Sequence, residues 1–330
     1  MNDYTIVSSR VRLARNFADV PFPSRASAVD AEYVAKTVLS AAKDVREGKF
    51  YSMEGLDKRE KAYLVERHLI SPALASAPFG AAFLSKDKRL SVMIMEEDHV
   101  RAQSFAVGLA LKECFEEVKE YDLALRAKTS LAYDKKLGYL TACPTNVGTG
   151  MRASVMMFLP GITMQEGGIE ELEEELKKAN LTIRGALGEG SKGEGYCYQI
   201  SNGVSLGVSE ETIINRVASA AEMILEIEGK MLERYYAEDK LAVEDAVFRA
   251  LAILGAARTL SQKELEYYMV YLKIGVSLGL IAPLKVDPDE LLVMCKPYGV
   301  IQLTQCEDTP AGRDVARAEF IRNIIHAKEG

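Results

Sequence analysis

The 330-residue sequence contains few of the residues that usually build a metal site or a disulfide framework. Its three histidines are too few to favour histidine-based metal ligation. Its five cysteines are widely spaced, odd in number and never arranged as Cys-x-x-Cys, which favours a reducing cytosol over disulfides or a zinc site. There is also no secretory leader and no apolar run long enough to cross a bilayer. We therefore expect a cytoplasmic protein without a membrane partner.

Two well-known signatures of ATP-binding proteins are missing as well. There is no Gly-x4-Gly-Lys-Ser/Thr loop, and no His-Arg-Asp or Asp-Phe-Gly motif of protein kinases. If ATP binds, arginine side chains rather than a P-loop lysine must hold its phosphates. The formal net charge of −7 argues against direct binding of nucleic acid. Against that acidic background, arginines concentrated in a few short segments are informative.

What the sequence does contain is a mixed pattern followed by a helical one. Apolar periodicity predicts helices at 28–47, 58–70, 107–118, 153–159, around 172–176, and from 209 to about 240. Alternation predicts strands at 89–95, 137–143 and 204–208. The remainder is predicted to be helical, with capping signals at Ser261-x-x-Glu264, Asp287-Pro288 and Thr309-Pro310. We predict a first domain of residues 1–238 and a helical domain of residues 239–330.

Acidic residues follow one of the predicted strands. Glu96 and Glu97 stand beside Asp98, and three adjacent acids repel one another unless a cation or solvent relieves them. These residues could form an exposed acidic turn. Alternatively, one of the carboxylates could accept two parallel N–H bonds from a guanidinium and take its proton. Glu189 lies in a glycine-rich loop, Gly185 to Gly195, where an isolated acid would by itself be a weak indication.

Five arginines lie within or beside short motifs rich in Ser, Glu, Gly or Cys: Arg10, Arg12, Arg101, Arg152 and Arg184. Arginine is common on solvated surfaces. At motif positions, however, its planar forked donors suit phosphoryl transfer, which depends on positioning and electrostatic stabilisation.

Cys143 ends a predicted strand just before Pro144. Such a cysteine is either an inert small core residue or a thiolate favoured by nearby arginines. His99 is the one histidine within these motifs, and no cysteine-protease signature surrounds Cys143, which makes a covalent Cys–His mechanism the less attractive choice.

Together, four segments resemble the phosphagen (guanidino) kinase superfamily over residues 8 to about 236. They are Ser-Ser-Arg-Val-Arg-Leu-Ala-Arg-Asn from Ser8, Glu-Glu-Asp-His from Glu96, Cys-Pro-Thr-Asn-Val-Gly-Thr-Gly from Cys143, and Arg-Gly-x-x-Gly-Glu-Gly-Ser from Arg184. Within the superfamily the chain is most similar to the bacterial protein-arginine kinases, the McsB family. The run from Arg313 to Ala318 resembles the Arg-Asp-x-x-Arg-Ala motif of that family.

The resemblance implies an α+β fold, in which a catalytic domain with an antiparallel sheet flanked by helices precedes an all-helical domain. It implies ATP, with Mg²⁺ held through the ATP phosphates rather than by protein ligands. It implies nucleotide contacts at Ser9, Arg10, Arg12, His99, Arg101, Arg152 and Arg184. It also implies that Glu97 and Glu189 hold the substrate guanidinium and remove a proton, with Glu96 supporting them and a Cys143 thiolate against the substrate.

Arg313 and Asp314 correspond to an allosteric phosphoarginine pocket in that family. Taken alone, this motif favours an exposed helix turn with an incidental ion pair, and its position behind a kinase-like domain reverses that preference. Met95 departs from the family pattern, which usually has asparagine before the acidic pair. The helical domain is expected to form a homodimer, with several of Val270, Ile274, Leu278 and Leu280 meeting a second copy.

The resemblance thus implies an ATP-dependent kinase that phosphorylates arginine side chains of proteins, marks them for Clp-type proteolysis and takes part in the stress response. The resemblance implies a zinc-finger activator (McsA-like), a heat-shock repressor and a Clp protease as partners. Two alternatives stay open. One is a kinase for free arginine or another small guanidino compound, and the other is a non-catalytic Clp adaptor.

Overall fold

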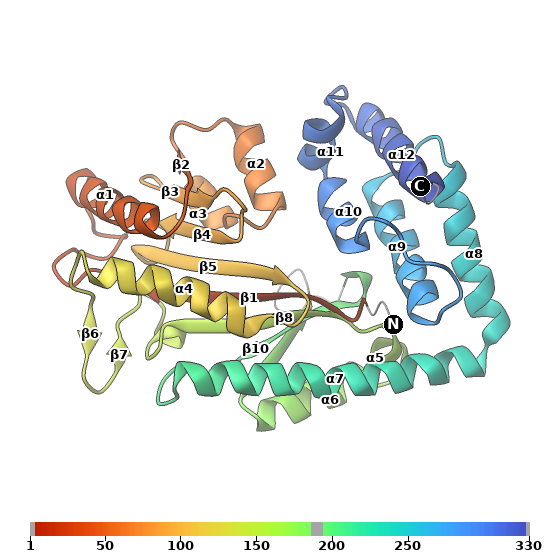
Figure 1. Ribbon diagram of the computed structural model, residues 1–330, viewed down its shortest axis with the longest axis horizontal. Coiled ribbons are helices and arrows are strands. Elements are labelled where there is room, and N and C mark those ends of the chain that lie inside the picture. Colours follow the sequence, from red (N-terminus) through yellow and green to blue (C-terminus); the bar gives the residue numbers. More distant parts are fainter. Residues whose placement is uncertain (1–3, 186–193, 328–330) are drawn as a thin grey trace.

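One eight-stranded antiparallel sheet forms the centre of the computed structural model, which describes residues 4–185 and 194–327 (Figure 1). From edge to edge its strands are β2 (Gly48–Ser52), β3 (Ala81–Ser85), β4 (Leu90–Ile94), β5 (Val100–Val107), β1 (Ile6–Arg15), β8 (Met151–Phe158), β10 (Cys197–Asn202) and β9 (Leu181–Gly185). An antiparallel sheet with flanking helices and a helical C-terminal part confirms the predicted fold class.

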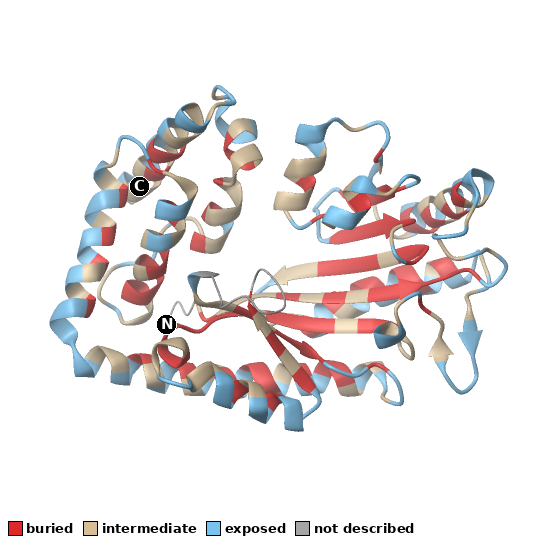
Figure 2. Cartoon of the chain, turned by 180° about the vertical axis from the view of Figure 1, so that it is seen from behind, coloured by how far each residue is buried: buried red, intermediate tan, exposed pale blue. Residues whose placement is uncertain are grey.

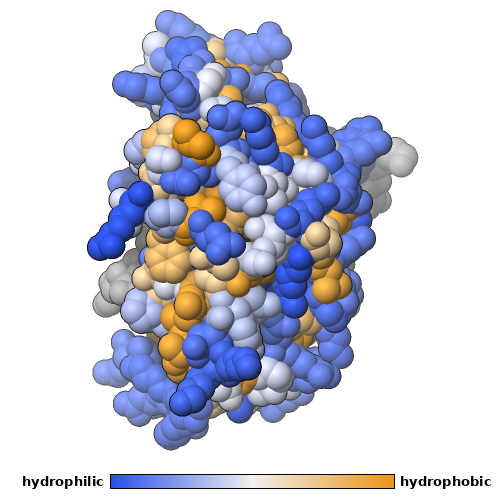
Figure 3. Space-filling model, turned by 90° about the vertical axis from the view of Figure 1, so that its left-hand side faces the viewer, coloured by the Kyte–Doolittle hydropathy of each residue, from blue (hydrophilic) through white to orange (hydrophobic). Residues whose placement is uncertain are grey.

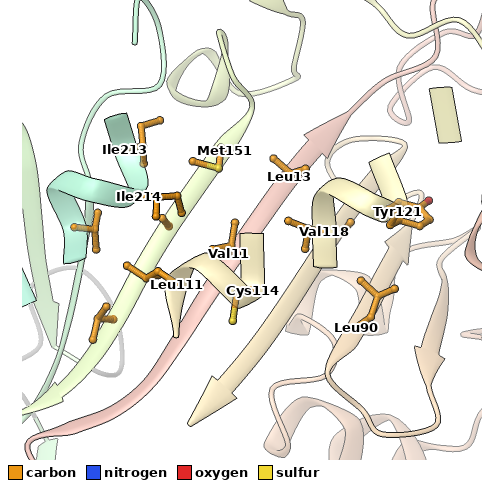
Figure 4. Packing of buried hydrophobic residues seen from close by; sticks show 14 of the residues in the cluster. Val11, Leu13, Leu90, Leu111, Cys114, Val118, Tyr121, Met151, Ile213 and Ile214 are labelled. Atoms are coloured by element: carbon orange, nitrogen blue, oxygen red, sulfur yellow. The ribbon is translucent and has the colours of Figure 1, made fainter. Parts of the chain in front are cut away.

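Helices α1 (Ala28–Val45), α4 (Leu111–Arg126) and α7 (Glu210–Glu238) cover one face of this sheet. Side chains alternate between the two faces of a strand, so Val11 and Leu13 of β1 point toward these helices. Figure 4 shows Val11 and Leu13 packed among residues of α4 and α7, such as Val118 and Ile214. This core fixes which face of β1 is turned away from it. At the β9 edge, α6 (Gly168–Lys178) packs against the sheet.

In the described part of the chain, two helices cover the opposite face at the end formed by β3 and β4. There α2 (Lys58–Glu66) and α3 (Pro72–Ser76) build a smaller apolar cluster on Ala82, Leu84 and Met93. All five residues of each of these two strands are consequently buried, whereas β1 and β8 alternate between buried and half-buried positions (Figure 2). The central strands therefore keep a partly open polar face.

The C-terminal residues form a helical module of α8 (Lys240–Ala256), α9 (Gln262–Ser277), α10 (Pro288–Met294), α11 (Pro297–Thr304) and α12 (Pro310–His326). Its own apolar cluster includes Leu254, Met269 and Ile321. The predicted N-caps at Ser261, Asp287 and Thr309 are confirmed, and each side chain accepts a backbone N–H of the first turn. In the described part of the chain, no helix combines the length and apolar character needed to cross a membrane.

The face that we expected to meet a second copy lies inside the chain. Val270 and Ile274 are 8% and 1% exposed and belong to a cluster with Phe158 and Leu232 of the first domain; Leu278 and Leu280 pack against that cluster. That expectation was wrong, because apolar periodicity cannot tell an interface between domains from one between subunits.

Several predicted elements need correction. Of the helix predicted at 153–159, residues 153–158 belong to strand β8, and residues 204–208 are not a strand, since β10 ends at Asn202. Residues 107–110 are not helical, because β5 ends at Val107 and α4 begins at Leu111. Helix α2 ends at Glu66, and of residues 137–143 only β7 (Gly138–Tyr139) is a strand, paired with β6 (Tyr133–Asp134). Short helix α5 (Pro160–Met164) follows β8.

The end of the molecule that carries α1 and the β6–β7 hairpin faces away from the helical module. Hydrophilic side chains cover most of this end, with hydrophobic ones gathered in a stripe between them (Figure 3). Val29 and Tyr133 are exposed hydrophobic residues on these elements. This surface is mixed in character and lies away from the open face of the central strands.

Candidate active site

Four of the five predicted arginines gather on the open face of neighbouring strands. Arg10 and Arg12 lie on β1, Arg101 on β5 and Arg152 on β8. Arg12 stands directly opposite Arg152 in the β1–β8 ladder, and Ala14 stands opposite Arg101 in the β1–β5 ladder. Because these strands are adjacent, segments up to 142 positions apart in sequence (Arg10 and Arg152) place their guanidinium groups side by side.

This concentration of positive charge costs energy unless an anion is present. Burial, then the neighbouring Arg152 and Arg101, lower the pKa of Arg10 to about 10, and burial with the same kind of repulsion lowers the pKa of Arg12. Arg10 Nε is buried without a hydrogen-bond partner in the described structure. Its guanidinium lies 5.7 Å from the centre of the Phe105 ring. A half-buried cluster of cations with an unsatisfied N–H donor is what a polyphosphate would satisfy.

A cavity of about 190 Å³ brings together the residues predicted for catalysis and phosphate binding. Its lining includes Arg12, Glu97, Arg101, Cys143 and Arg152. The cavity thus places an exposed carboxylate and a thiol directly beside the arginine cluster. A reacting group held there would contact both signs of charge.

The acidic turn has two members with different surroundings. Arg101 forms a bidentate ion pair with Glu96, with Nη1 3.1 Å from Oε1 and Nη2 2.8 Å from Oε2. Glu96 is 4% exposed and also accepts a hydrogen bond from Ser71 Oγ. Glu97 is 45% exposed and has only a 3.5 Å contact with Arg101. Glu96 is therefore occupied in orienting Arg101, whereas Glu97 is available to a substrate.

Asp98 ties the acidic turn to the cysteine segment. Its Oδ1 accepts hydrogen bonds from Asn16 Nδ2 at 2.6 Å and from the Ala142 amide at 2.7 Å. The adjoining segment then returns to the sheet through Gly150, where φ is +63° and a Cβ would lie 2.6 Å from the Ala14 carbonyl oxygen. These contacts hold Cys143 and Glu97 on the rim of one cavity and explain the second glycine of the motif.

Met95 occupies an unusual backbone conformation just before the acidic pair. Its φ is +57°, a left-handed value that asparagine tolerates better than most other residues. Its side chain is 3% exposed and packs in the main core. The methionine keeps the turn geometry and adds core packing, and no charged group of the site is lost.

Cys143 is half-buried, and its Sγ lies 3.0 Å from Thr145 Oγ1. The nearest histidine of the motifs, His99, is buried elsewhere, so the thiol has no imidazole base. We predict that stoichiometric alkylation of Cys143 inactivates the enzyme by filling the cavity, while Cys143→Ala keeps residual activity. Turnover assays with mass mapping of the label will check this. Full activity after alkylation, or a trapped phosphocysteine, would contradict it.

Two larger cavities continue along the same strands. One of about 420 Å³ is lined by Ser8 and Arg10 of β1 and by Ser154 and Met156 of β8. One of about 700 Å³ lies between the sheet and the helical module and shares Ser8 and Met156 with the second cavity. In the ladder Ser8 pairs with Met156, Arg10 with Ser154 and Arg12 with Arg152, so the three cavities follow one another along β1.

Sequence reasoning missed His68, which lines both larger cavities. It follows α2 in a left-handed conformation with φ +57°. Although the ring opens onto the cavities, desolvation, then Lys296 and Arg10, lower the pKa of His68 to about 4 and keep it neutral near pH 7. The sequence shows the histidine but not its left-handed backbone conformation. It does not show its neighbours either, because they come from distant segments of the chain.

Of the described site residues that were predicted, Ser9, His99 and Arg184 do not line the small cavity. Arg10 lines the neighbouring cavity, and Glu96 pairs with Arg101 without lining the small cavity itself. Ser9 points to the opposite face of β1, where its Oγ donates to the Gly108 carbonyl and accepts the Ala110 amide. His99 is fully buried, accepts the Phe17 amide at Nδ1 and lies 2.8 Å from the Pro21 carbonyl at Nε2. Arg184 lies on the edge strand β9, and Glu189 falls outside the described residues.

Arg313 and Asp314 lie in the first turns of α12, far along the chain from these cavities. Arg313 pairs with Asp308 at 2.5 Å, and Asp314 pairs with the buried Arg317 at 2.7 Å. Asp308 also contacts Arg59 of α2 at 2.8 Å. Asp308 therefore links Arg313 of this motif to Arg59 of the catalytic domain.

Comparisons with known proteins agree with this arrangement. Residues 30–231 match the model of the ATP:guanido phosphotransferase C-terminal catalytic domain, and residues 240–330 match that of the protein-arginine kinase McsB C-terminal domain. A crystal structure of lombricine kinase shares the fold, with a TM-score of 0.63 and 23% identity over 73% of this chain and 70% of that chain. The catalytic domain therefore defines an enzyme of the guanidino phosphotransferase class.

Two relatives narrow the class. The protein-arginine kinase of Halothermothrix orenii is 40% identical over 327 residues, which are 97% of this chain and 93% of the relative. That of Bacillus subtilis is 37% identical over 327 residues, 97% of this chain and 90% of the relative. The chain belongs to the protein-arginine kinase family.

Proposed function

We propose that this enzyme transfers the γ-phosphoryl group of ATP to arginine side chains of proteins. The observation that supports the proposal most is the small cavity, where Glu97 and Cys143 meet Arg12, Arg101 and Arg152. Guanidinium recognition and phosphoryl transfer need opposite charges within one small volume, and this cavity supplies both.

In the proposed complex the nucleotide follows β1. Its phosphates lie at Arg12 and Arg152, and its adenosine part lies toward Ser8 and Met156, which are about 13 Å away at roughly 3.3 Å per strand residue. Mg²⁺ would bind through the ATP phosphates, which is the arrangement that the family resemblance implies. When bound there, Mg²⁺ neutralises phosphate charge as that charge moves toward the leaving group.

The chemical step is a direct displacement. Glu97 orients the target guanidinium and accepts a proton from its attacking nitrogen. The nitrogen forms a bond to the γ-phosphorus as the bond from that phosphorus to the β,γ-bridging oxygen breaks, which gives phosphoarginine and ADP. Arg12, Arg101 and Arg152 stabilise the charge on the transferring phosphoryl group, and Arg101 is held for this role by Glu96. Glu189 shares the guanidinium contact in this proposal.

The direct test is incubation with ATP, Mg²⁺ and either a casein-like protein or free arginine. Acid-labile phosphate on the protein supports the proposal. Phosphate on free arginine alone would instead identify a kinase for small guanidino compounds, and its absence from both would leave a non-catalytic adaptor.

We also propose that Arg313 and Asp314 bind phosphoarginine, so that product on a partner protein raises activity. The support is the helix N-terminus beside Arg313, and the pairing of Arg313 with Asp308, which a phosphoryl group would replace. We predict that Arg313→Ala with Asp314→Ala abolishes the activation by added phosphoarginine and keeps basal turnover. Rate measurements with and without phosphoarginine will decide. An equal response in wild type and double variant would rule the site out.

The remaining proposals concern assembly and physiology. Exposed Leu241 and Phe248 on α8 offer a face on which a second copy could pack, which would give the expected homodimer. We further propose a cytoplasmic role in Clp-dependent proteolysis and the stress response, with a zinc-finger activator and a heat-shock repressor as partners, by analogy with the family.

A further inference from the structure

The 700 Å³ cavity has walls from two domains. Val7, Ser8 and Met156 come from the sheet, whereas Leu292 and Lys296 come from the helical module. The residues that line the small cavity all come from the first domain. The base end of a nucleotide laid along β1, however, points directly at the module, because Ser8 and Met156 line both larger cavities.

Lys296 is one of three lysines of the module that line this cavity, with Lys263 and Lys273, and it contacts His68. Its Nζ lies 3.5 Å from His68 Nε2 and 3.4 Å from the Glu66 carbonyl oxygen. His68 is itself a wall residue of both larger cavities. The ammonium group is therefore at the mouth between them, and it can donate hydrogen bonds in directions that its protein partners leave open.

The position of Lys296 is fixed by a contact between domains. Lys296 is the N-cap residue of α11, and the carboxylate of Glu66 accepts the amide N–H groups of Tyr298 and Gly299, each at 3.0 Å from Oε2. Arg59 and Asp308 add an ion pair of 2.8 Å between α2 and the module. These bonds hold the base of the lysine side chain against the segment that carries His68.

We infer that the helical module completes the nucleotide site, with Lys296 donating a hydrogen bond to the adenosine part of the bound nucleotide. This inference rests on the proposed function and adds a residue from the second domain to it. Adenosine is uncharged and carries acceptors on its purine ring and ribose, and the nearby Met156, Val7 and Leu292 supply apolar contact for a flat base. Binding of nucleotide and docking of the module then favour each other.

The experiment measures dissociation constants of ADP and of inorganic tripolyphosphate by calorimetry. The variants are Lys296→Met, Lys296→Arg and, as a charge control on the exposed surface of α7, Lys230→Met. We expect Lys296→Met to weaken ADP binding about tenfold, with unchanged binding of tripolyphosphate. Lys296→Arg should recover most of the loss, and Lys230→Met should match wild type.

Equal ADP affinity of wild type and Lys296→Met would overturn the inference. So would an equal loss for ADP and tripolyphosphate, because Lys296 would then act through the fold or the phosphates. Thermal unfolding of each variant shows whether the substitution destabilises the fold. If Lys296→Met is destabilised, the ADP affinity of Lys296→Arg is the measurement that tests the inference. If the wild type phosphorylates protein but Lys296→Met binds ADP normally, only this inference fails. If the wild type transfers no phosphate, the proposed function fails first.

Discussion

Glu97→Gln will lower the rate of phosphoryl transfer by about 10²–10⁴ while ATP binding stays near normal. The amide keeps the size of the side chain but can neither accept the guanidinium proton nor offer the charge that holds the substrate. Glu97 lines the small cavity and is 45% exposed, so the substitution leaves no buried group without a partner. Single-turnover kinetics and nucleotide titration will measure the two quantities separately.

The matched control is Glu116→Gln, which replaces an exposed acid on α4 that forms a 3.4 Å ion pair with Lys119. It should leave transfer and binding unchanged. A Glu97→Gln variant with near-normal turnover would show that another base removes the proton, and the assignment of Glu97 would be wrong.

Arg152→Ala will weaken ATP binding by about 10- to 100-fold and adenosine binding much less, since a charge-assisted hydrogen bond contributes roughly 1.5–3 kcal/mol. Arg152 faces Arg12 across the ladder, and its Nη2 donates to Ser201 Oγ at 3.1 Å. Removing it takes one cation from the cluster that would meet the phosphates.

Arg216→Ala, on the exposed surface of α7, is the control and should bind both ligands as wild type does. Calorimetric titration with ATP and with adenosine gives both affinities. An equal loss of both ligands in Arg152→Ala would mean that this arginine acts by supporting the fold.

The helices that pack on the core were predictable because their apolar residues recur with helical periodicity. Val34, Val38 and Ala41 of α1 are all fully buried, as their spacing indicated. Strand β8 was not predictable in this way. Its open face carries Met156 beside the buried Val155 and Met157, so the run reads as continuously apolar and fits a short helix equally well. In β1, Ser8, Arg10 and Arg12 alternate with buried residues. This alternation is typical of a strand, but no strand was predicted there.

The site was partly predictable for a related reason. Arginines, acids and Cys143 could be named from short motifs, but the motif did not reveal which face of a strand each side chain takes. Ser9 illustrates this, since it neighbours Arg10 and points into the core. Lys296 and His68 are 228 residues apart in the sequence, so no local sequence pattern could predict their contact.

The pairing of β1 with β5 and β8 also limits which mutations this strand tolerates during evolution. Val11 and Leu13 are buried beneath α4 while Arg10 and Arg12 face the cavities. Inserting or deleting one residue in this strand would exchange the two sets, burying guanidinium groups in the core and removing the phosphate contacts together. Homologous genes should therefore differ in this strand by substitution only, and length variation should be confined to the turns, such as the β6–β7 hairpin.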